Sequence, residues 1–108
     1  MPNHVFVVSE WLAKENQEQE LREQFKKLLN LSLENESGCI SARVTHQVEH
    51  PGSPTKSKYT IVLLQEYADI KAFDIHCKAE YVTNFFKKFI ENKETALVED
   101  WQCRLFSE

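Results

Sequence analysis

One histidine lies where it could act on a small molecule. His76 is surrounded by apolar and aromatic residues in the segment QEYADIKAFDIHCKAEYVTNFFKKF, residues 65–89, whose spacing predicts a helix. An imidazole takes up and releases protons near neutral pH, so a histidine on an apolar helix face is suited to acid–base chemistry in a dry pocket. The other interpretation is a core histidine paired with a polar neighbour. The residues alone leave both interpretations open.

The motifs of several other chemistries are missing from the chain. It has no GxGxxG, P-loop, GxSxG or HExxH sequence, which argues against nucleotide binding, serine hydrolysis and zinc proteolysis. His46 and His50 flank the end of a predicted strand, where their spacing does not bring the side chains together. The three cysteines, Cys39, Cys77 and Cys103, form no CxxC pair. We therefore expect no metal site, and free thiols such as a reducing compartment maintains.

Composition and charge narrow the class of protein. With 108 residues, 42% of them hydrophobic and 28% charged, the chain is expected to form one globular domain over residues 1–108. The formal net charge is −4 and the Lys and Arg residues are scattered, so there is no basic stripe for nucleic acid. The apolar run near the N-terminus is too short for a signal peptide or a membrane span. We expect a cytoplasmic protein that binds neither nucleic acid nor membranes.

Four segments rich in β-branched and aromatic residues predict strands. The first and third are apolar on both faces, which is typical of a strand that is covered on both sides. In the second, the apolar residues Ile40, Ala42, Val44 and Val48 are assigned to one face. The four predicted strands are Val5–Leu12, Cys39–Val48, Tyr59–Tyr67 and Ala96–Phe106.

Two helical regions separate the strands. Residues 14–35 carry a stripe that predicts an amphipathic helix, formed by Leu21, Phe25, Leu28, Leu29 and either Ser32 or Leu33. Gly38 follows and is expected to take a left-handed turn conformation. Asp69 is a predicted N-cap for the second region, which begins at Ile70, breaks near residues 78–80 and resumes to residue 90. Residues 49–58 are rich in Pro, Gly and Ser and predict a loop between the second and third strands.

The order of elements is β-α-β-β-α-β, which predicts an α+β, ferredoxin-like fold with an antiparallel four-stranded sheet and helices on one face. Helices cover one face of such a sheet, yet the strands are apolar on both. We therefore expect a homodimer in which two sheets pack face to face.

The fold would collect a few side chains into a pocket. Ser9 and Trp11 share one face of the first strand, and Gln65 and Tyr67 share one face of the third. If these faces point toward the helices, they surround residues of the second helical region. The residues so gathered are His76, Tyr81 and Phe85. An apolar, aromatic cavity with a few polar groups is the usual form of a small-molecule site.

The chain resembles the antibiotic biosynthesis monooxygenase (ABM) family, also called quinol-monooxygenase-like. The likeness extends over nearly the whole chain. It rests on the lead-in KENQEQELREQF, the E-x-G-C turn at residues 36–39, and the motif EY-x-D-x-x-AF-x-x-H from Glu66 to His76, with the aromatic Phe85 beyond it. Members are dimeric α+β barrels of ferredoxin-like protomers. The family often has Glu where this chain has Gln65, so the resemblance indicates a chemistry and not a particular substrate.

That resemblance implies oxidation of a small aromatic or quinol-type compound by dioxygen, without metal or flavin. His76 would take the phenolic proton as the catalytic residue. The substrate-binding residues would be Ser9, Trp11, Gln65, Tyr67, Phe73, Tyr81 and Phe85, the polar ones orienting oxygens and the aromatic ones stacking on rings.

Three other functions are weighed against this one. Similar folds host isomerases of small metabolites, and a phosphorylated substrate would need converging basic groups, for which only Arg43 and Lys71 are candidates. A non-catalytic ligand-binding or stress-response barrel would hold His76 bonded to the backbone in a filled core. Haem oxygenation is disfavoured, because the Asn, Trp and His of that branch align with Ser9, Tyr67 and Phe86.

Overall fold

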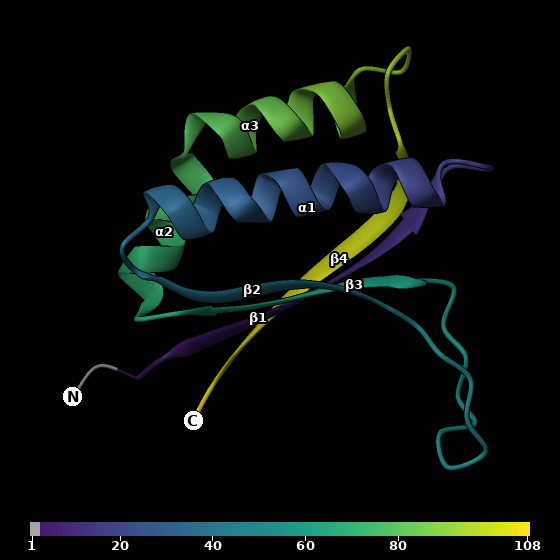
Figure 1. Ribbon diagram of the computed structural model, residues 1–108, viewed down its shortest axis with the longest axis horizontal. Helices are drawn as coiled ribbons and strands as arrows, with labels where there is room; N and C mark the ends of the chain where they lie inside the picture. Colours follow the sequence, from purple (N-terminus) through teal and green to yellow (C-terminus); the bar gives the residue numbers. More distant parts are fainter. Residues whose placement is uncertain (1–2) are drawn as a thin grey trace.

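Four antiparallel strands form one sheet with all the helices on one face (Figure 1). The computed structural model describes residues 3–108, and the strand order in the sheet is β2-β3-β1-β4. The predicted ferredoxin-like arrangement is confirmed. The elements are β1 (Val5–Ala13), α1 (Glu18–Asn35), β2 (Cys39–His46), β3 (Ile61–Tyr67), α2 (Ile70–Lys78), α3 (Glu80–Phe86), the π-helical turn η1 (Lys87–Glu91) and β4 (Val98–Ser107).

The central strand β1 sets which residues face the helices. Ser9 is paired with Leu63 of β3 on one side and with Cys103 of β4 on the other. Side chains alternate between the faces of a strand, so alternate residues of β1, β3 and β4 share the helix-facing side of the sheet. In β1 and β3 these alternate positions are buried. Strand β4 lies at the edge, where the helices cover it less, and its residues from Trp101 onward are exposed.

Helix α1 begins later than its sequence pattern suggests. Asn16 takes a positive φ of 64° in a turn before the helix, and this conformation stops the helix from starting at Lys14. Ser32 is completely buried on the inner side of α1, whereas Leu33 is 43% exposed. The stripe therefore continues through the serine, which places a hydroxyl at the inner end of the helix.

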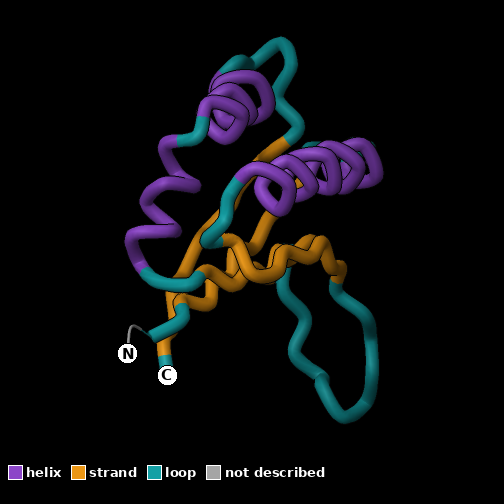
Figure 2. The backbone as a smooth tube through the Cα atoms, turned by 60° about the vertical axis from the view of Figure 1, so that its left-hand side comes forward, coloured by secondary structure: helices purple, strands orange, loops and turns teal. Residues whose placement is uncertain are grey.

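The second helical region breaks where the pattern predicted. The Asp69 carboxylate accepts a hydrogen bond of 2.8 Å from the Ala72 backbone N–H, so the predicted N-cap is confirmed. At Ala79 the backbone is extended, with φ −61° and ψ 137°, which separates α2 from α3. The break lets α3 run alongside α1 while α2 lies across the end of the sheet (Figures 1 and 2).

The predicted left-handed conformation of Gly38 is wrong. No glycine among residues 3–108 has a positive φ. The glycine serves a close approach instead: a Cβ added to Gly38 would lie 2.5 Å from the Cβ of Ala72. The turn between α1 and β2 therefore packs directly against α2 because position 38 has no side chain.

The loop between β2 and β3 extends away from the body of the fold. Figures 1 and 2 both show residues 47–60 projecting from the side of the sheet opposite the helices. In this arrangement the loop does not cover the space between the sheet and the helices. Among residues 3–108, no helix is long and apolar enough to cross a bilayer.

Candidate functional site

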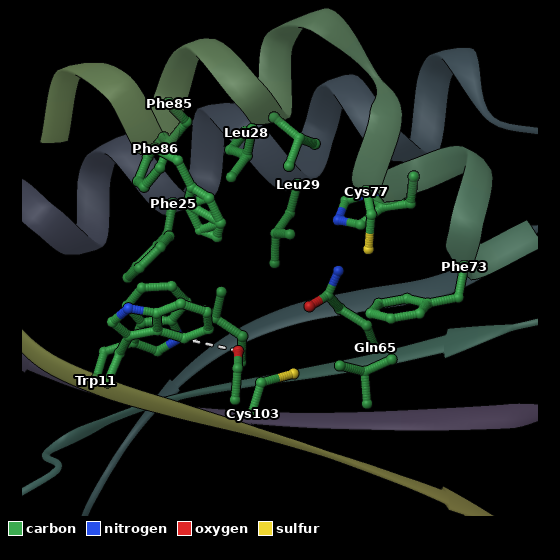
Figure 3. A pocket seen from close by; sticks show the side chains of 16 residues that line it. Trp11, Phe25, Leu28, Leu29, Gln65, Phe73, Cys77, Phe85, Phe86 and Cys103 are labelled. Atoms are coloured by element: carbon green, nitrogen blue, oxygen red, sulfur yellow. Dashed lines mark hydrogen bonds between the residues drawn. The ribbon is translucent and has the colours of Figure 1, made fainter. Parts of the chain in front are cut away.

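A cavity of about 190 Å³ lies between the sheet and the helices. Its floor comes from β1, β3 and β4, and its roof from α1, α2 and α3 (Figure 3). Drug-sized pockets are typically about 300–1,000 Å³, so this cavity suits a compact ligand of one or two rings. The lining is dominated by apolar and aromatic side chains.

One end of the cavity is a cluster of stacked aromatic rings. Trp11 of β1 and Trp101 of β4 stack with their ring centroids 4.9 Å apart and their planes 9° apart. This pair exists because the sheet register places the two residues side by side. Phe25 packs on Trp11 from α1 at 4.8 Å, and Phe86 packs on Trp101 from α3 at 5.3 Å. The result is a flat-walled surface suited to aromatic rings.

Polar groups border the cavity in the sheet floor. The Ser9 hydroxyl accepts a 2.8 Å hydrogen bond from Trp11 Nε1, so its own O–H remains available to donate. The Gln65 amide projects from β3 toward the helices (Figure 3) and donates a 2.8 Å hydrogen bond to the Tyr67 hydroxyl. Both side chains are buried, so a ligand oxygen that they contacted would be screened from bulk water.

His76 faces these groups from α2 and is itself held by a buried polar cluster. Its Nδ1 lies 3.1 and 3.2 Å from the two carboxylate oxygens of Glu36 and 3.2 Å from the Ser32 hydroxyl. The Tyr81 hydroxyl donates to the same carboxylate. Burial, followed by this hydrogen bond to Glu36, raises the pKa of Tyr81 to about 12, so its O–H stays protonated at neutral pH. The side chains of His76 and Glu36 are only 9% and 6% exposed.

Six of the eight residues predicted for the site border the cavity together: Ser9, Trp11, Gln65, Phe73, His76 and Phe85. The other two lie behind its wall. Tyr67 is completely buried, burial raises the pKa of its hydroxyl, and that hydroxyl touches Gln65. Tyr81 is half-buried and touches Glu36.

Sequence reasoning missed the residues that support His76. Glu36 enters the sequence pattern only through the E-x-G-C turn, although a carboxylate just after an apolar stripe is a candidate partner for an imidazole. Ser32 occupied a position on that stripe, which was the available signal for a buried hydroxyl. Trp101 and Cys103 could have been found from the alternation of β4, once its pairing with β1 was known.

Two thiols also border the cavity. Cys77 of α2 and Cys103 of β4 are both exposed to solvent and both belong to the lining, so the cavity opens between these elements. Partial burial raises the pKa of each thiol. Cys39 is buried in a core cluster with Val5, Val7 and Tyr67 and is not part of the lining.

The cavity lining carries no Lys or Arg side chain among the described residues. Arg43 is exposed on the opposite face of β2, since it pairs with Leu64, and Lys71 is exposed on α2. Residues 3–108 also contain no group of three or more His, Cys, Asp or Glu side chains arranged to hold a metal ion.

A ferredoxin-like sheet with an aromatic cavity under its helices defines a class of small α+β proteins. Within that class, the family described as antibiotic biosynthesis monooxygenase matches residues 2–88, so the chain belongs to this family. A comparison with curated proteins finds no match.

Solved structures with the same fold resemble the whole chain. A protein from Shewanella oneidensis is 20% identical with a TM-score of 0.75, and the match covers 100% of this chain and 93% of that one. A candidate antibiotic biosynthesis monooxygenase from Caulobacter crescentus CB15 is 16% identical with a TM-score of 0.76, covering 99% and 91%. A protein from Bacteroides fragilis NCTC 9343, described as dimeric and ferredoxin-like, is 13% identical with a TM-score of 0.72, covering 97% and 96%. At these identities the likeness shows the fold.

Proposed function

We propose that the protein is a monooxygenase that oxidises a small, neutral aromatic or quinol-type compound with dioxygen, without a metal or flavin. The observation that carries the proposal is an imidazole beside a cavity whose lining is mostly apolar and aromatic. Membership of the family supports the same reaction class.

In this reaction the protein needs to supply little more than a base and a site that excludes water. Removal of the phenolic proton gives an electron-rich anion, which passes an electron to dioxygen; the two radicals then combine. Loss of water from the resulting hydroperoxide leaves a new carbonyl, so one oxygen atom enters the substrate and the other departs with two substrate hydrogens. His76 is the group placed to take the first proton, and the Ser9 O–H and the Gln65 amide would hold the charge that develops on the substrate oxygens.

The remaining predicted residues take supporting roles in this proposal. Trp11, Phe73 and Phe85 would contact the rings of the substrate. Tyr67 would act through Gln65, whose amide it holds, and Tyr81 would act through Glu36.

An oxygen-uptake assay with a panel of reduced naphthoquinols tests the proposal. Superoxide dismutase and catalase are added to both the protein sample and the buffer control, because they suppress autoxidation chains. Under these conditions the purified protein should consume dioxygen faster than the buffer. With isotopically labelled dioxygen, the product should carry one labelled atom. Uptake no faster than buffer across the panel, with no labelled product, would refute the reaction class.

A ligand-binding barrel is the alternative, because a cavity can hold a ligand without chemistry. The filled core and the backbone-bonded His76 expected for it are not found: a cavity lies under the helices, and His76 contacts the side chains of Glu36 and Ser32. An isomerase of phosphorylated compounds has less support, since no Lys or Arg side chain among the described residues borders the cavity.

Thiol labelling measures occupancy of the cavity independently of any reaction. In the free protein a maleimide should label Cys77 and Cys103 faster than the buried Cys39. Addition of 2-naphthol should slow labelling of the first two, read by mass spectrometry on the Cys77→Ser and Cys103→Ser variants, each of which keeps one reporter. Unchanged rates at saturating naphthol would show that the cavity does not bind such rings. Protection without oxygen uptake would favour the binding barrel.

We further propose that the protein forms a homodimer through the sheet face opposite the helices. Apolar residues of three strands lie on that face, among them Phe6, Leu64 and Phe106, the last two being 42% and 47% exposed. Faces of this kind are normally covered. Three unpaired cysteines support a cytoplasmic location for such a dimer.

Sedimentation at micromolar concentration should give a dimer for the wild type. Leu64→Glu should give a folded monomer, because it places a charge at the centre of the proposed contact. Leu31→Glu is the matched control: Leu31 is 39% exposed on α1, so this variant should remain dimeric. A monomeric wild type would contradict the proposed assembly.

A further inference from the structure

The cavity wall behind His76 contains a carboxylate that the proposed reaction has not yet used. Glu36 is the C-cap of α1, and its backbone N–H bonds to the Ser32 carbonyl at 2.9 Å, which fixes the start of the turn. Its side chain turns inward and is almost completely buried. Burying a carboxylate destabilises the fold unless its oxygens accept hydrogen bonds, so the contacts of Glu36 indicate its role.

Among the described residues, Nδ1 makes all three hydrogen-bond contacts of the imidazole, and two of them are to Glu36. A carboxylate has lone pairs and no proton to donate, so an unprotonated Nδ1 at 3.1 Å would face it lone pair to lone pair. The contact is favourable only when Nδ1 carries the proton. Among residues 3–108, the hydrogen-bond contacts of His76 all involve Nδ1 and no fully buried side-chain nitrogen lacks a partner, so Nε2 is not fully buried; His76 borders the cavity.

We propose that Glu36 is a positioning residue: its carboxylate fixes His76 as the Nδ1–H tautomer, which presents the Nε2 lone pair to the cavity, and it stabilises the imidazolium that forms when Nε2 takes a proton. The proposal deepens the monooxygenase function and rests on it for the identity of that proton. The rest of the buried cluster supports this arrangement: the Tyr81 hydroxyl donates to the carboxylate, the Ser32 hydroxyl contacts Nδ1, and the Ser32 carbonyl accepts from the Glu36 backbone N–H.

The surroundings leave Glu36 as the charged partner of the imidazole. Tyr67 and Phe73 contribute rings at 5.2 and 6.1 Å from the imidazole, measured between centroids. The other titratable groups packed around the cluster are phenols and thiols, whose pKa values burial raises, so they are neutral at neutral pH: Cys39 of β2, Tyr67 of β3, Cys77 of α2, Tyr81 of α3 and Cys103 of β4.

The tautomer of His76 can be measured without any substrate, by the imidazole nitrogen shifts of protein carrying nitrogen-15 histidine. In the wild type at a pH where the ring is neutral, the proton is expected on Nδ1. Glu36→Gln should remove that preference, because an amide can also donate to Nδ1. Glu34→Gln, which changes an exposed glutamate of the same helix, should leave the tautomer unchanged. A wild-type ring with its proton on Nε2, or a Glu36→Gln ring still protonated on Nδ1, would overturn the proposal.

Kinetics supply the second readout. Glu36→Gln should lower kcat for the best quinol about 10- to 100-fold, as expected for loss of a hydrogen bond to a charged group, with KM changed little. Tyr81→Phe, which keeps the carboxylate and removes one donor to it, should lower kcat less. A rise in KM at unchanged kcat would assign Glu36 to substrate binding instead and refute the proposal. If the wild type oxidises no quinol, the reaction class fails while the tautomer measurement still decides the role of Glu36.

Discussion

His76→Gln is expected to lower the rate of quinol oxidation by about 100-fold or more, since a positioned general base typically contributes roughly 10²–10⁴. The glutamine can still donate to the Glu36 carboxylate, so the buried charge keeps a partner and the fold should survive. What the amide cannot do is accept the phenolic proton, because it is not basic near neutral pH. The measurement is kcat in the oxygen-uptake assay, with circular dichroism and the unfolding midpoint to verify folding.

The matched control is His46→Gln. His46 is exposed at the end of β2, where its Nδ1 contacts Arg22 on the surface, and it does not border the cavity. This variant should retain full activity. Equal kcat for His76→Gln and the wild type would remove the proton-transfer role and leave His76 as a packed core residue. Raising the pH should partly restore the activity of the His76→Gln variant, because more of the substrate is then already ionised in solution.

The fold could be predicted because its signals are local and repeated. The alternation in β1 and β3, the stripe of α1 and the cap at Asp69 each specify an element, and their order specifies the sheet. The cavity followed from the same periodicity, since Ser9, Trp11 and Gln65 had to share the inner face of paired strands. Short-range patterns therefore sufficed for the residues that the sheet itself positions.

The contacts that hold the histidine were not predictable in this way. Glu36 and His76 are separated by 40 residues and meet only because the end of α1 packs against α2. One detail after the turn between α1 and β2 was also not predicted. A register shift between Cys39 and Ser41 turns Ile40 outward, where it is exposed, although its position suggested the face of Ala42. Such positions are determined by packing between residues far apart in the sequence, which a local sequence pattern does not indicate.

In the turn between α1 and β2, Gly38→Ala is expected to destabilise the protein by about 1–3 kcal/mol, the usual cost of overpacking. At a position with negative φ, replacing Gly by Ala normally stabilises by roughly 0.4–1 kcal/mol through the unfolded chain, so backbone conformation would predict the opposite sign. A steric clash reverses this sign, because the new Cβ would lie 2.5 Å from the Cβ of Ala72, and neither atom belongs to a flexible side chain. Urea unfolding measures the change.

Two further variants identify the cause. Gly52→Ala should change stability by no more than about 0.5 kcal/mol, since its Cβ would meet only the movable ring of His50, at 3.1 Å, in an exposed loop. Ala72→Gly removes the opposing Cβ, so the Gly38→Ala/Ala72→Gly double variant should be more stable than the sum of the single changes predicts. Strict additivity would contradict the steric account. His76 lies on α2 and Glu36 lies in the turn, so Gly38→Ala should also lower kcat. The double variant should recover part of the lost kcat. That result would show that the glycine is required to bring the base and its carboxylate together.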